Sequence, residues 1–242
     1  MYKRQVIDNL LKKYDEKIAV EKISFEVNQG ETIGILGPNG AGKTTLFYMI
    51  AGLINPDSGN ILLGDERLNT ESISRRTSLG LSYLPQESSI FRGLTVEHNI
   101  LSSLEQRKDL NPKERINCLA SLLDEFNLSE FSSTQGIKLS GGERRRTEIA
   151  RSLASNPKFM LLDEPFAGID PLAVADLKNT IIKLNEKKIG VLISDHNVRD
   201  TMNICSKVIV VNKGKIIANG KPDEIAKDSL VKEVYLGQNF LN

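Results

Sequence analysis

The chain has few of the residues from which disulfide-bonded and metal-bound scaffolds are built. Only two of its 242 residues are cysteines, Cys118 and Cys205. They stand far apart in the sequence and form no C-x-x-C pair, so neither a disulfide framework nor a cysteine-bound metal site is expected. We expect both cysteines to be small residues of the hydrophobic core.

Long apolar runs and an excess of one charge are missing as well. No run approaches the ~18–20 apolar residues of a transmembrane helix, and residues 1–9 lack the apolar core of a signal peptide. With 32 basic and 31 acidic residues, the net charge of +1 gives no overall electrostatic reason to bind nucleic acid or an anionic membrane. These absences predict a cytoplasmic protein without a nucleic-acid partner.

The most informative stretch is a phosphate-binding pattern, G-x-x-x-x-G-K-[ST]. It consists of Gly37, Pro38, Asn39, Gly40, Ala41, Gly42, Lys43 and Thr44. The apolar run before it predicts a buried strand, and residues 45–50 predict the start of a buried helix. Glycines turn backbone N–H groups inward, and the helix N-terminus adds about half a positive charge to this anion nest. We expect Lys43 to reach the β- and γ-phosphates of a nucleotide, Thr44 to hold Mg²⁺ and Thr45 to contact a further phosphate.

The remaining patterns predict one α/β domain with helices inserted into it. Hydrophobic residues make up 40% of the chain and charged residues 26%, which is typical of a globular protein with a substantial core. Residues 95–155 are mostly helical in pattern; Asn111-Pro112 opens one helix, and Ser140 or a neighbour caps another that runs to about Ser155. We expect an α/β core over about 1–85 and 158–242 and a helical subdomain over about 86–157.

Within that core, apolar runs and turn signals mark the individual elements. The phosphate-loop helix is expected to end near 51–52, and Tyr14 to precede the first sheet. Strands are expected within 5–36 and at 61–63, 79–84, 158–163, 189–194, 208–211 and 215–218. Helices are expected at 171–187 and 222–236.

Two acids follow the apolar run at 159–162. A strand there carries Asp163 to the carboxyl edge of the sheet, beside the expected phosphates, where it can bind Mg²⁺. Glu164 faces a different way and can polarise an attacking water as general base. An acid pair is weak evidence alone, and the phosphate-binding pattern upstream makes this pair a predicted catalytic site.

A second anion site is predicted at Ser140, Gly141 and Gly142, because these residues make a further exposed helix N-terminus. The helix that follows is rich in arginine. We interpret those arginines as a solvated basic helix face, with a functional role as the alternative. They are Arg144, Arg145, Arg146 and Arg151.

Together these motifs resemble those of the ATP-binding subunits of ABC transporters, over nearly the whole chain. Leu139 to Glu143 is similar to the family's signature sequence, with Glu143 where glutamine is more usual; we expect this change to be tolerated. The resemblance implies a P-loop NTPase core with a mostly parallel sheet, an N-terminal antiparallel β subdomain and an inserted α-helical subdomain. It also implies a head-to-tail homodimer with two ATP molecules and Mg²⁺ at its interface.

Further site residues follow from the resemblance, one position at a time. Tyr14 matches the aromatic residue that stacks on adenine, although a lone tyrosine is more often a packing residue. Gln86 matches the glutamine that senses Mg²⁺ and the attacking water. Asp170 matches the acid that communicates across the dimer, and His196 matches the histidine that contacts the γ-phosphate. His98 matches no motif.

The resemblance also implies two transmembrane permease subunits, which would hold the chain peripherally on the cytoplasmic face of the inner membrane. The segment after Gln86 lines the groove that receives a permease helix in this family. Phe91 and Arg92 are candidate contacts there, because an aromatic anchor and a charged side chain are common hot-spot types.

Three branches of the family remain open. The stretches 139–151, 161–171, 194–199 and 234–237 closely resemble ATP-binding subunits of lipopolysaccharide exporters. Subunits of branched-chain amino acid importers share several of these stretches. A soluble ABC-type ATPase acting on DNA or ribosomes is the third alternative, but such proteins usually carry coiled-coil insertions or two fused cassettes.

Overall fold

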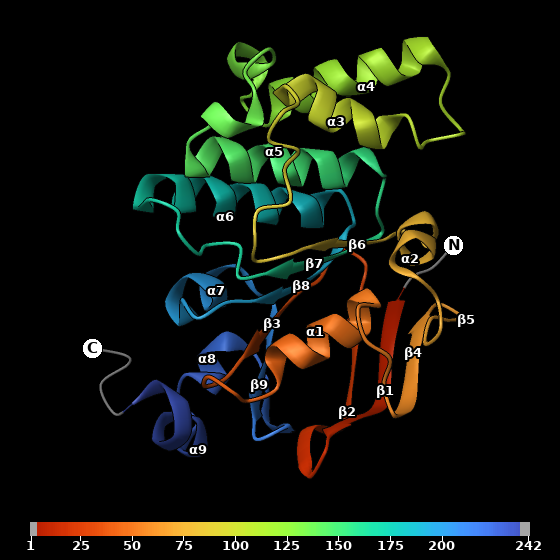
Figure 1. The fold of residues 1–242 in the computed structure, drawn as a ribbon. Coiled ribbons are helices and arrows are strands. Elements are labelled where there is room, and N and C mark those ends of the chain that lie inside the picture. Colours follow the sequence, from red (N-terminus) through yellow and green to blue (C-terminus); the bar gives the residue numbers. More distant parts are fainter. Residues whose placement is uncertain (1–3, 238–242) are drawn as a thin grey trace.

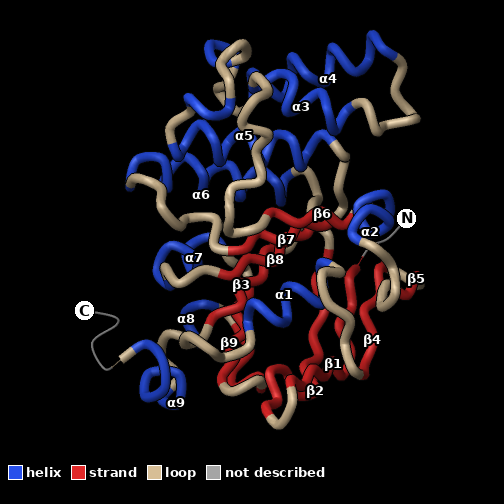
Figure 2. Tube along the Cα trace, viewed as in Figure 1, coloured by secondary structure: helices blue, strands red, loops and turns tan. Residues whose placement is uncertain are grey.

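A central sheet separates two different layers in the part of the chain that the structure, a computed structural model, describes, residues 4–237 (Figure 1). A layer of helices covers one face of this sheet. Helix α1 and a second sheet lie on the other side, and Figure 2 shows the strands of the two sheets in red. Each layer has its own cluster of buried apolar side chains.

The central sheet has six strands in the order β10-β9-β3-β8-β7-β6, and only the edge strand β10 is antiparallel to its neighbour. Its strands are β3 Thr32–Leu36, β6 Leu81–Leu84, β7 Phe159–Asp163, β8 Gly190–Ser194, β9 Lys207–Asn212 and β10 Lys215–Gly220. Every residue of β3, β7 and β8 is buried, as expected of continuous apolar runs covered on both faces. Ser194 pairs with Asp163 and with Ile35, so the carboxyl ends of these three strands meet at one edge.

The second sheet is antiparallel, in the order β2-β1-β4-β5. Its strands are β1 Arg4–Tyr14, β2 Lys17–Asn28, β4 Ser58–Leu63 and β5 Glu66–Arg67. Ile23, Phe25 and Val27 alternate with exposed residues and pack in the same core cluster as helix α1, Lys43–Ala51. Tyr14 is the last residue of β1, so the expectation that it precedes the sheet was wrong.

Four longer helices form the other layer: α3 Val96–Leu104, α4 Pro112–Glu125, α5 Gly141–Ala154 and α6 Pro171–Glu186. Short 3₁₀ turns at Ser129–Phe131 and Gly136–Lys138 connect α4 to α5. The predicted starts are confirmed: Asn111 caps α4, with Pro112 in its first turn, and Ser140 caps α5. Among residues 4–237, none of the helices combines the length and the apolar character needed to cross a membrane.

The remaining elements are short: α2 Ile73–Leu79, α7 Val198–Ile204, α8 Pro222–Ile225, α9 Ser229–Val231 and a π-helix at Lys232–Leu236. The single helix expected over 222–236 is therefore broken after Ile225. The strand expected over 79–84 starts only at Leu81. Leu79 ends α2 instead, and Gly80 stops this helix with the left-handed φ of 103° that glycine adopts readily. Helix α1 ends at Ala51 with Gly52 as its cap, as predicted. Both cysteines are free thiols, and Cys205 is buried.

Candidate nucleotide-binding site

The phosphate loop joins β3 to α1, and two of its glycines lie where there is no room for a side chain. A Cβ atom on Gly37 would lie 2.0 Å from the carbonyl oxygen of Val211, and one on Gly42 would lie 2.2 Å from that of Ala19. Gly42 also has a left-handed φ of 107°. No side chain caps α1, and its first turn carries no acid, so its first N–H groups stay available to an anion.

Lys43 lies across this loop. Its ammonium donates to the carbonyl oxygens of Gly37 (2.7 Å) and Pro38 (3.1 Å). Burial lowers the pKa of Lys43, and the nearby charges of Glu164 and Asp163 oppose that shift. The structure therefore brings the predicted phosphate-binding lysine and both predicted acids into one electrostatic environment.

Asp163 ends β7 and is buried. Its carboxylate accepts a hydrogen bond from the Tyr83 hydroxyl at 3.2 Å. Burial raises the pKa of Asp163 to about 6, although the Tyr83 hydrogen bond acts in the opposite direction. A buried carboxylate with acceptor capacity left over is a suitable partner for a cation.

Glu164 lies just beyond the strand in a sharp turn. Its φ of 43° is one that residues with a side chain seldom adopt, and its N–H donates to the Ser194 carbonyl at 2.6 Å. Gln86 donates to one Glu164 carboxylate oxygen at 2.7 Å, and Nδ1 of His196 lies 3.4 Å from the same oxygen. Three residues that the sequence analysis placed in catalytic roles thus meet at one carboxylate, from three separate loops.

Asp195 also shapes this edge, and the sequence analysis gave it no role. It is fully buried and accepts hydrogen bonds from the N–H groups of Phe166 (3.0 Å) and Asn197 (2.8 Å). Burial raises its pKa. Asp195 therefore ties the loop after Glu164 to the loop that carries His196, and its place directly before that histidine was the only signal in the sequence.

Ser140 and Glu143 form a reciprocal pair at the start of α5. The Ser140 hydroxyl accepts from the Glu143 N–H at 3.3 Å, and the Glu143 carboxylate accepts from the Ser140 N–H at 2.9 Å. Ser140 and Gly141 are exposed as predicted, but the prediction was wrong for Gly142, which is buried because it packs against Ala173. Helices α5 and α1 belong to different core clusters on opposite sides of the central sheet, so this N-terminus and the phosphate loop lie in different layers (Figure 1).

Two predicted contacts lie at exposed positions around the site. The Tyr14 ring is about half exposed, with the Lys12 ammonium 5.6 Å from its centre, and the same sheet touches the phosphate loop where Ala19 meets Gly42. Asp170 caps α6, because its carboxylate accepts from the Ala173 N–H at 3.0 Å.

Comparison with known proteins decides the family. The family model described as "ABC transporter" matches residues 20–167, more than half of the chain. This chain belongs to the ABC transporter family.

Curated relatives match it almost from end to end. The lipopolysaccharide export system ATP-binding protein LptB of Haemophilus influenzae is 51% identical over 233 residues, 96% of this chain and 97% of that protein. The protein of the same name from Escherichia coli (strain K12) is 49% identical, with 96% of each chain covered. The ADP conformation of MJ1267, an ATP-binding cassette of an ABC transporter, superposes with a TM-score of 0.86 at 27% identity and covers 98% of this chain.

Membership of the ABC family makes this chain an ATP-binding and ATP-hydrolysing subunit of a transporter. ABC ATPases in general work as dimers together with a membrane permease. The predicted fold class, an α/β P-loop core with an antiparallel N-terminal sheet and inserted helices, is confirmed.

The predicted permease contacts of this ABC subunit lie on its helical layer. Phe91 is 52% exposed, and the guanidinium of Arg151 lies 4.9 Å from the centre of its ring. Ile137, 64% exposed, donates its N–H to the carbonyl of Arg92 at 3.0 Å. Phe91, Arg92 and Ile137 therefore form one exposed apolar and basic patch.

The interpretation of α5 as a solvated basic face was wrong for Arg145. Its side chain is only 6% exposed and pairs with Glu148 at 3.1 Å. Glutamate three residues after arginine lies on the same side of a helix, so this spacing was the available signal. Arg144 and Arg151 are half-buried rather than freely solvated, and each donates a hydrogen bond to a neighbouring segment.

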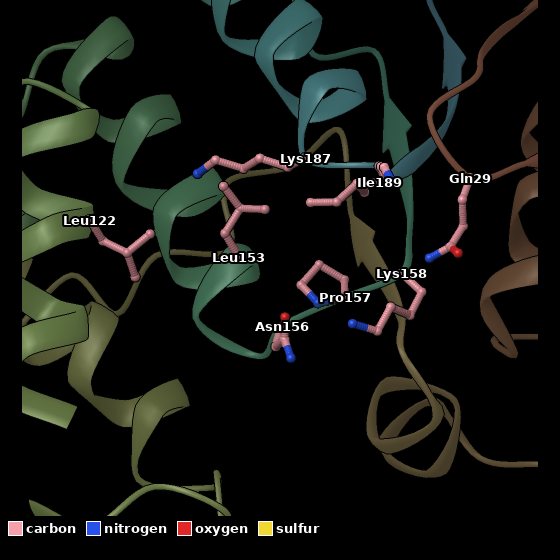
Figure 3. A pocket seen from close by; sticks show the side chains of 9 residues that line it. Gln29, Leu122, Leu153, Asn156, Pro157, Lys158, Lys187 and Ile189 are labelled. Carbon is pink, nitrogen blue, oxygen red and sulfur yellow. The ribbon is translucent and has the colours of Figure 1, made fainter. Parts of the chain in front are cut away.

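A cavity of about 640 Å³ lies at the other end of the central strands (Figure 3). Lys158 directly precedes β7 and Ile189 directly precedes β8, so this cavity opens at the amino ends of the strands, away from the phosphate loop. None of the predicted site residues lines it. Its lining is Gln29, Leu122, Leu153, Asn156, Pro157, Lys158, Lys187, Lys188 and Ile189.

Proposed function

We propose that this chain is the ATPase subunit of a lipopolysaccharide exporter, which moves lipopolysaccharide from the inner toward the outer membrane. The supporting observation is the 51% identity with the H. influenzae export protein over nearly the full length of both chains. The chain is a single cassette, with a core of about 1–85 and 158–242 and a helical subdomain of about 86–157. It lies on the cytoplasmic face of the inner membrane and is held there by two permease subunits.

The phosphate loop binds the β- and γ-phosphates of ATP. Its inward N–H groups and the uncapped start of α1 supply partial positive charge, and Lys43 exchanges its two carbonyl partners for phosphate oxygens. Thr45 adds a further contact, and Tyr14 stacks on the adenine. Removing Lys43 would therefore weaken nucleotide binding directly.

Mg²⁺ is held by Thr44, Asp163 and Gln86. All three offer oxygen ligands, the type that Mg²⁺ prefers. Within residues 4–237, no group of three or more acidic, histidine or cysteine side chains could hold a metal alone. Such a site suits Mg²⁺, which usually combines one or two carboxylates with waters and substrate phosphates. When bound, the ion would neutralise charge that develops on the phosphates.

Glu164 acts as general base on the attacking water. Gln86 and His196 contact the same carboxylate oxygen, so they hold Glu164 in position for this role. His196 is largely exposed and free to contact the γ-phosphate. The second anion site, formed by Ser140, Gly141 and Gly142, closes on the γ-phosphate held by the other copy, and Asp170 lies at that interface.

Affinity purification of the tagged chain from detergent-solubilised membranes of its own host tests the assignment. Recovery of two transmembrane proteins with a periplasmic bridge is the result expected for export. Recovery with a soluble periplasmic binding protein would replace it by an importer of the branched-chain amino acid type. Recovery without any membrane protein would refute a transport role.

Phe91→Ala should reduce recovery of the permease subunits while the isolated chain keeps its stability and nucleotide affinity, because the ring is exposed and contributes little to the fold. Ile116→Ala is the matched control, since Ile116 is equally exposed but lies on α4. Equal recovery for the two variants would remove Phe91 from the permease interface.

A further inference from the structure

Helix α5 holds the segment from Pro85 to Phe91 at several points along its length. Arg145 donates to the carbonyl oxygen of Pro85 at 3.0 Å, at the start of the segment. One turn further along the helix, Glu148 accepts from its middle, and Arg151 donates to the Ser89 hydroxyl at 2.8 Å. The segment therefore follows the helix on which the second anion site begins.

A buried ion pair on α5 makes most of the contacts that hold this segment. Arg145 is 6% exposed and Glu148 is 2% exposed, and their side chains lie 3.1 Å apart. One oxygen of Glu148 takes the arginine, while the other accepts from the Ser88 hydroxyl (2.8 Å), the Ser89 N–H (2.8 Å) and the Ile90 N–H (3.3 Å). A carboxylate alone among side chains can accept from this many donors, so its charge fixes the path of three consecutive residues.

The same pair reaches the catalytic edge. A second nitrogen of Arg145 donates to the main-chain carbonyl of Asp163 at 3.3 Å. Gln86 lies between Pro85 and Ser88, two residues that α5 holds through hydrogen bonds, and it donates to Glu164 at 2.7 Å. Phe91 directly follows Ile90, the last residue that Glu148 holds, and its ring packs under Arg151. The ion pair thus stands between the proposed catalytic groups and the proposed permease contact.

We propose that Arg145 and Glu148 are positioning residues that couple the nucleotide site to the permease contact. The pair obliges the Pro85–Phe91 segment to move together with α5 and with the end of β7, so that a change at Glu164 and Gln86 reaches Phe91. The inference rests on the proposed function, because it presumes that Glu164 and Gln86 respond to ATP and that Phe91 faces a permease. The pair does more than fill space, because well-packed apolar residues can replace two buried charges but cannot serve the main-chain groups of Pro85, Ser89 and Ile90.

The absence of tryptophan from the chain allows a direct test. Phe91→Trp introduces the only indole, and Glu164→Gln in the same chain allows ATP to bind without turnover. Addition of Mg-ATP should shift the emission maximum of the indole at position 91. Adding Glu148→Gln should abolish this shift, because an amide nitrogen cannot accept from the donors that the carboxylate serves.

Nucleotide affinity is measured in parallel with a fluorescent ATP analogue. It should change by less than about two-fold in the Glu148 variant, because the hydrogen bonds of Glu148 go to Ser88, Ser89, Ile90 and Arg145 and to none of the proposed nucleotide or Mg²⁺ contacts. Arg145→Met with Glu148→Leu provides the second variant, since it keeps an apolar core in place of the pair and should also lose the shift. Lys178→Met is the matched control: it breaks the Lys178–Asp200 pair (2.7 Å) between α6 and α7 and should keep the shift.

The outcomes separate the inference from the proposed function. A parent chain that fails to bind ATP refutes both. If the parent chain binds ATP and the emission maximum of its indole does not move, the coupling role alone is overturned. The same holds if the variants show the same emission shift as the parent. Loss of folding or of nucleotide affinity in both variants assigns the pair to stability and likewise overturns it.

Discussion

The backbone at Glu164 turns its carboxylate away from the strand that carries it. A left-handed φ at a residue with a side chain costs about 1–3 kcal/mol and persists only where neighbours enforce it. Here the hydrogen bond from its N–H to Ser194 enforces it. The turn separates Glu164 from Asp163, so two adjacent acids can take different partners: Tyr83 for Asp163, and Gln86 with His196 for Glu164.

Glu164→Gln should therefore keep nucleotide binding and lose hydrolysis. The amide retains the shape of the side chain but cannot accept a proton, and loss of a general base lowers kcat by about 10²–10⁴-fold. Phosphate release and an ATP titration check the two halves of this prediction. Glu87→Gln is the control, because Glu87 is the exposed neighbour of Gln86, and this variant should keep the wild-type turnover. A Glu164→Gln variant with near-normal kcat would show that Glu164 is not the general base.

Arg76 is a residue of another kind, because it serves the fold and has no carboxylate partner in the hydrogen bonds of the described chain. Its side chain is fully buried and donates to main-chain carbonyls, including those of Met49 and Ile50 at the end of α1. Burial lowers its pKa to about 10, so it stays charged at neutral pH. A cation at this end of a helix also complements the helix dipole.

Arg76→Met should lower the free energy of unfolding by about 3 kcal/mol, because it leaves buried carbonyl groups without donors. Urea denaturation followed by circular dichroism measures the change. Arg75→Met removes an exposed arginine from the same helix and should change stability by at most about 0.5 kcal/mol. Equal effects of the two substitutions would contradict the capping role.

The phosphate-binding residues could be predicted because their chemistry lies in one short stretch, residues 37–45. The roles of Arg76 and Asp195 could not, and neither could the burial of the Arg145–Glu148 pair, because their other partners are remote in sequence or belong to the main chain. A buried arginine and a solvated arginine look alike in a sequence. Only the fold shows that Arg145 faces Pro85 and Asp163 rather than water.

Among the elements, helix α5 shows how the family signature is built into helix capping. Ser140 is its cap and Glu143 completes the capping box, so both residues stabilise the helix start whose N–H groups form the second anion site. This explains why glutamate serves where glutamine is more usual: either side chain offers an oxygen to the Ser140 N–H.

Glu143→Gln should for this reason change both the free energy of unfolding and the ATPase rate very little, by about 0.5 kcal/mol or less in stability. Glu143→Ala removes the acceptor and should cost about 1 kcal/mol. Chemical denaturation of the three proteins gives the comparison. A glutamine variant as unstable as the alanine variant would show that the negative charge, rather than the hydrogen bond, stabilises this helix start.

The elements that the sequence revealed are those with strong end signals or long patterns. Asn111 with Pro112, and Ser140 with its glycines, fixed the starts of α4 and α5. Helices α2 and α7 escaped prediction because each has only seven residues, too few for an apolar period to repeat. Leu79 was placed in a strand for the same reason, since an apolar residue beside β6 fits either element.

On the scale of the whole molecule, the two anion sites of one chain lie apart. The phosphate loop and the start of α5 lie in layers on opposite sides of the central sheet, so a single chain presents them as separate surfaces (Figure 1). A second copy, placed head to tail, would set the Ser140 site of each chain against the phosphate loop of the other. Each composite site would then draw Lys43 and Glu164 from one chain and Ser140 from its partner.

Mixing two inactive variants tests this division of labour. Lys43→Ala disables the phosphate loop and Ser140→Arg blocks the second anion site, so either homodimer should be inactive. In a mixed dimer, one composite site carries both changes and the other carries neither. With random pairing and independent sites, activity should return to about a quarter of the wild-type value.

Lys43→Ala mixed with Glu164→Gln provides the matched control for this rescue. Both changes fall on the phosphate-loop side, so each site of the mixed dimer keeps one defect and no activity should return. Rates are measured after the purified chains have been mixed and allowed to exchange. No rescue in the first mixture, despite dimers formed between tagged and untagged chains, would mean that each chain completes its own site. Rescue in the control would mean that Lys43 and Glu164 of one chain serve different sites.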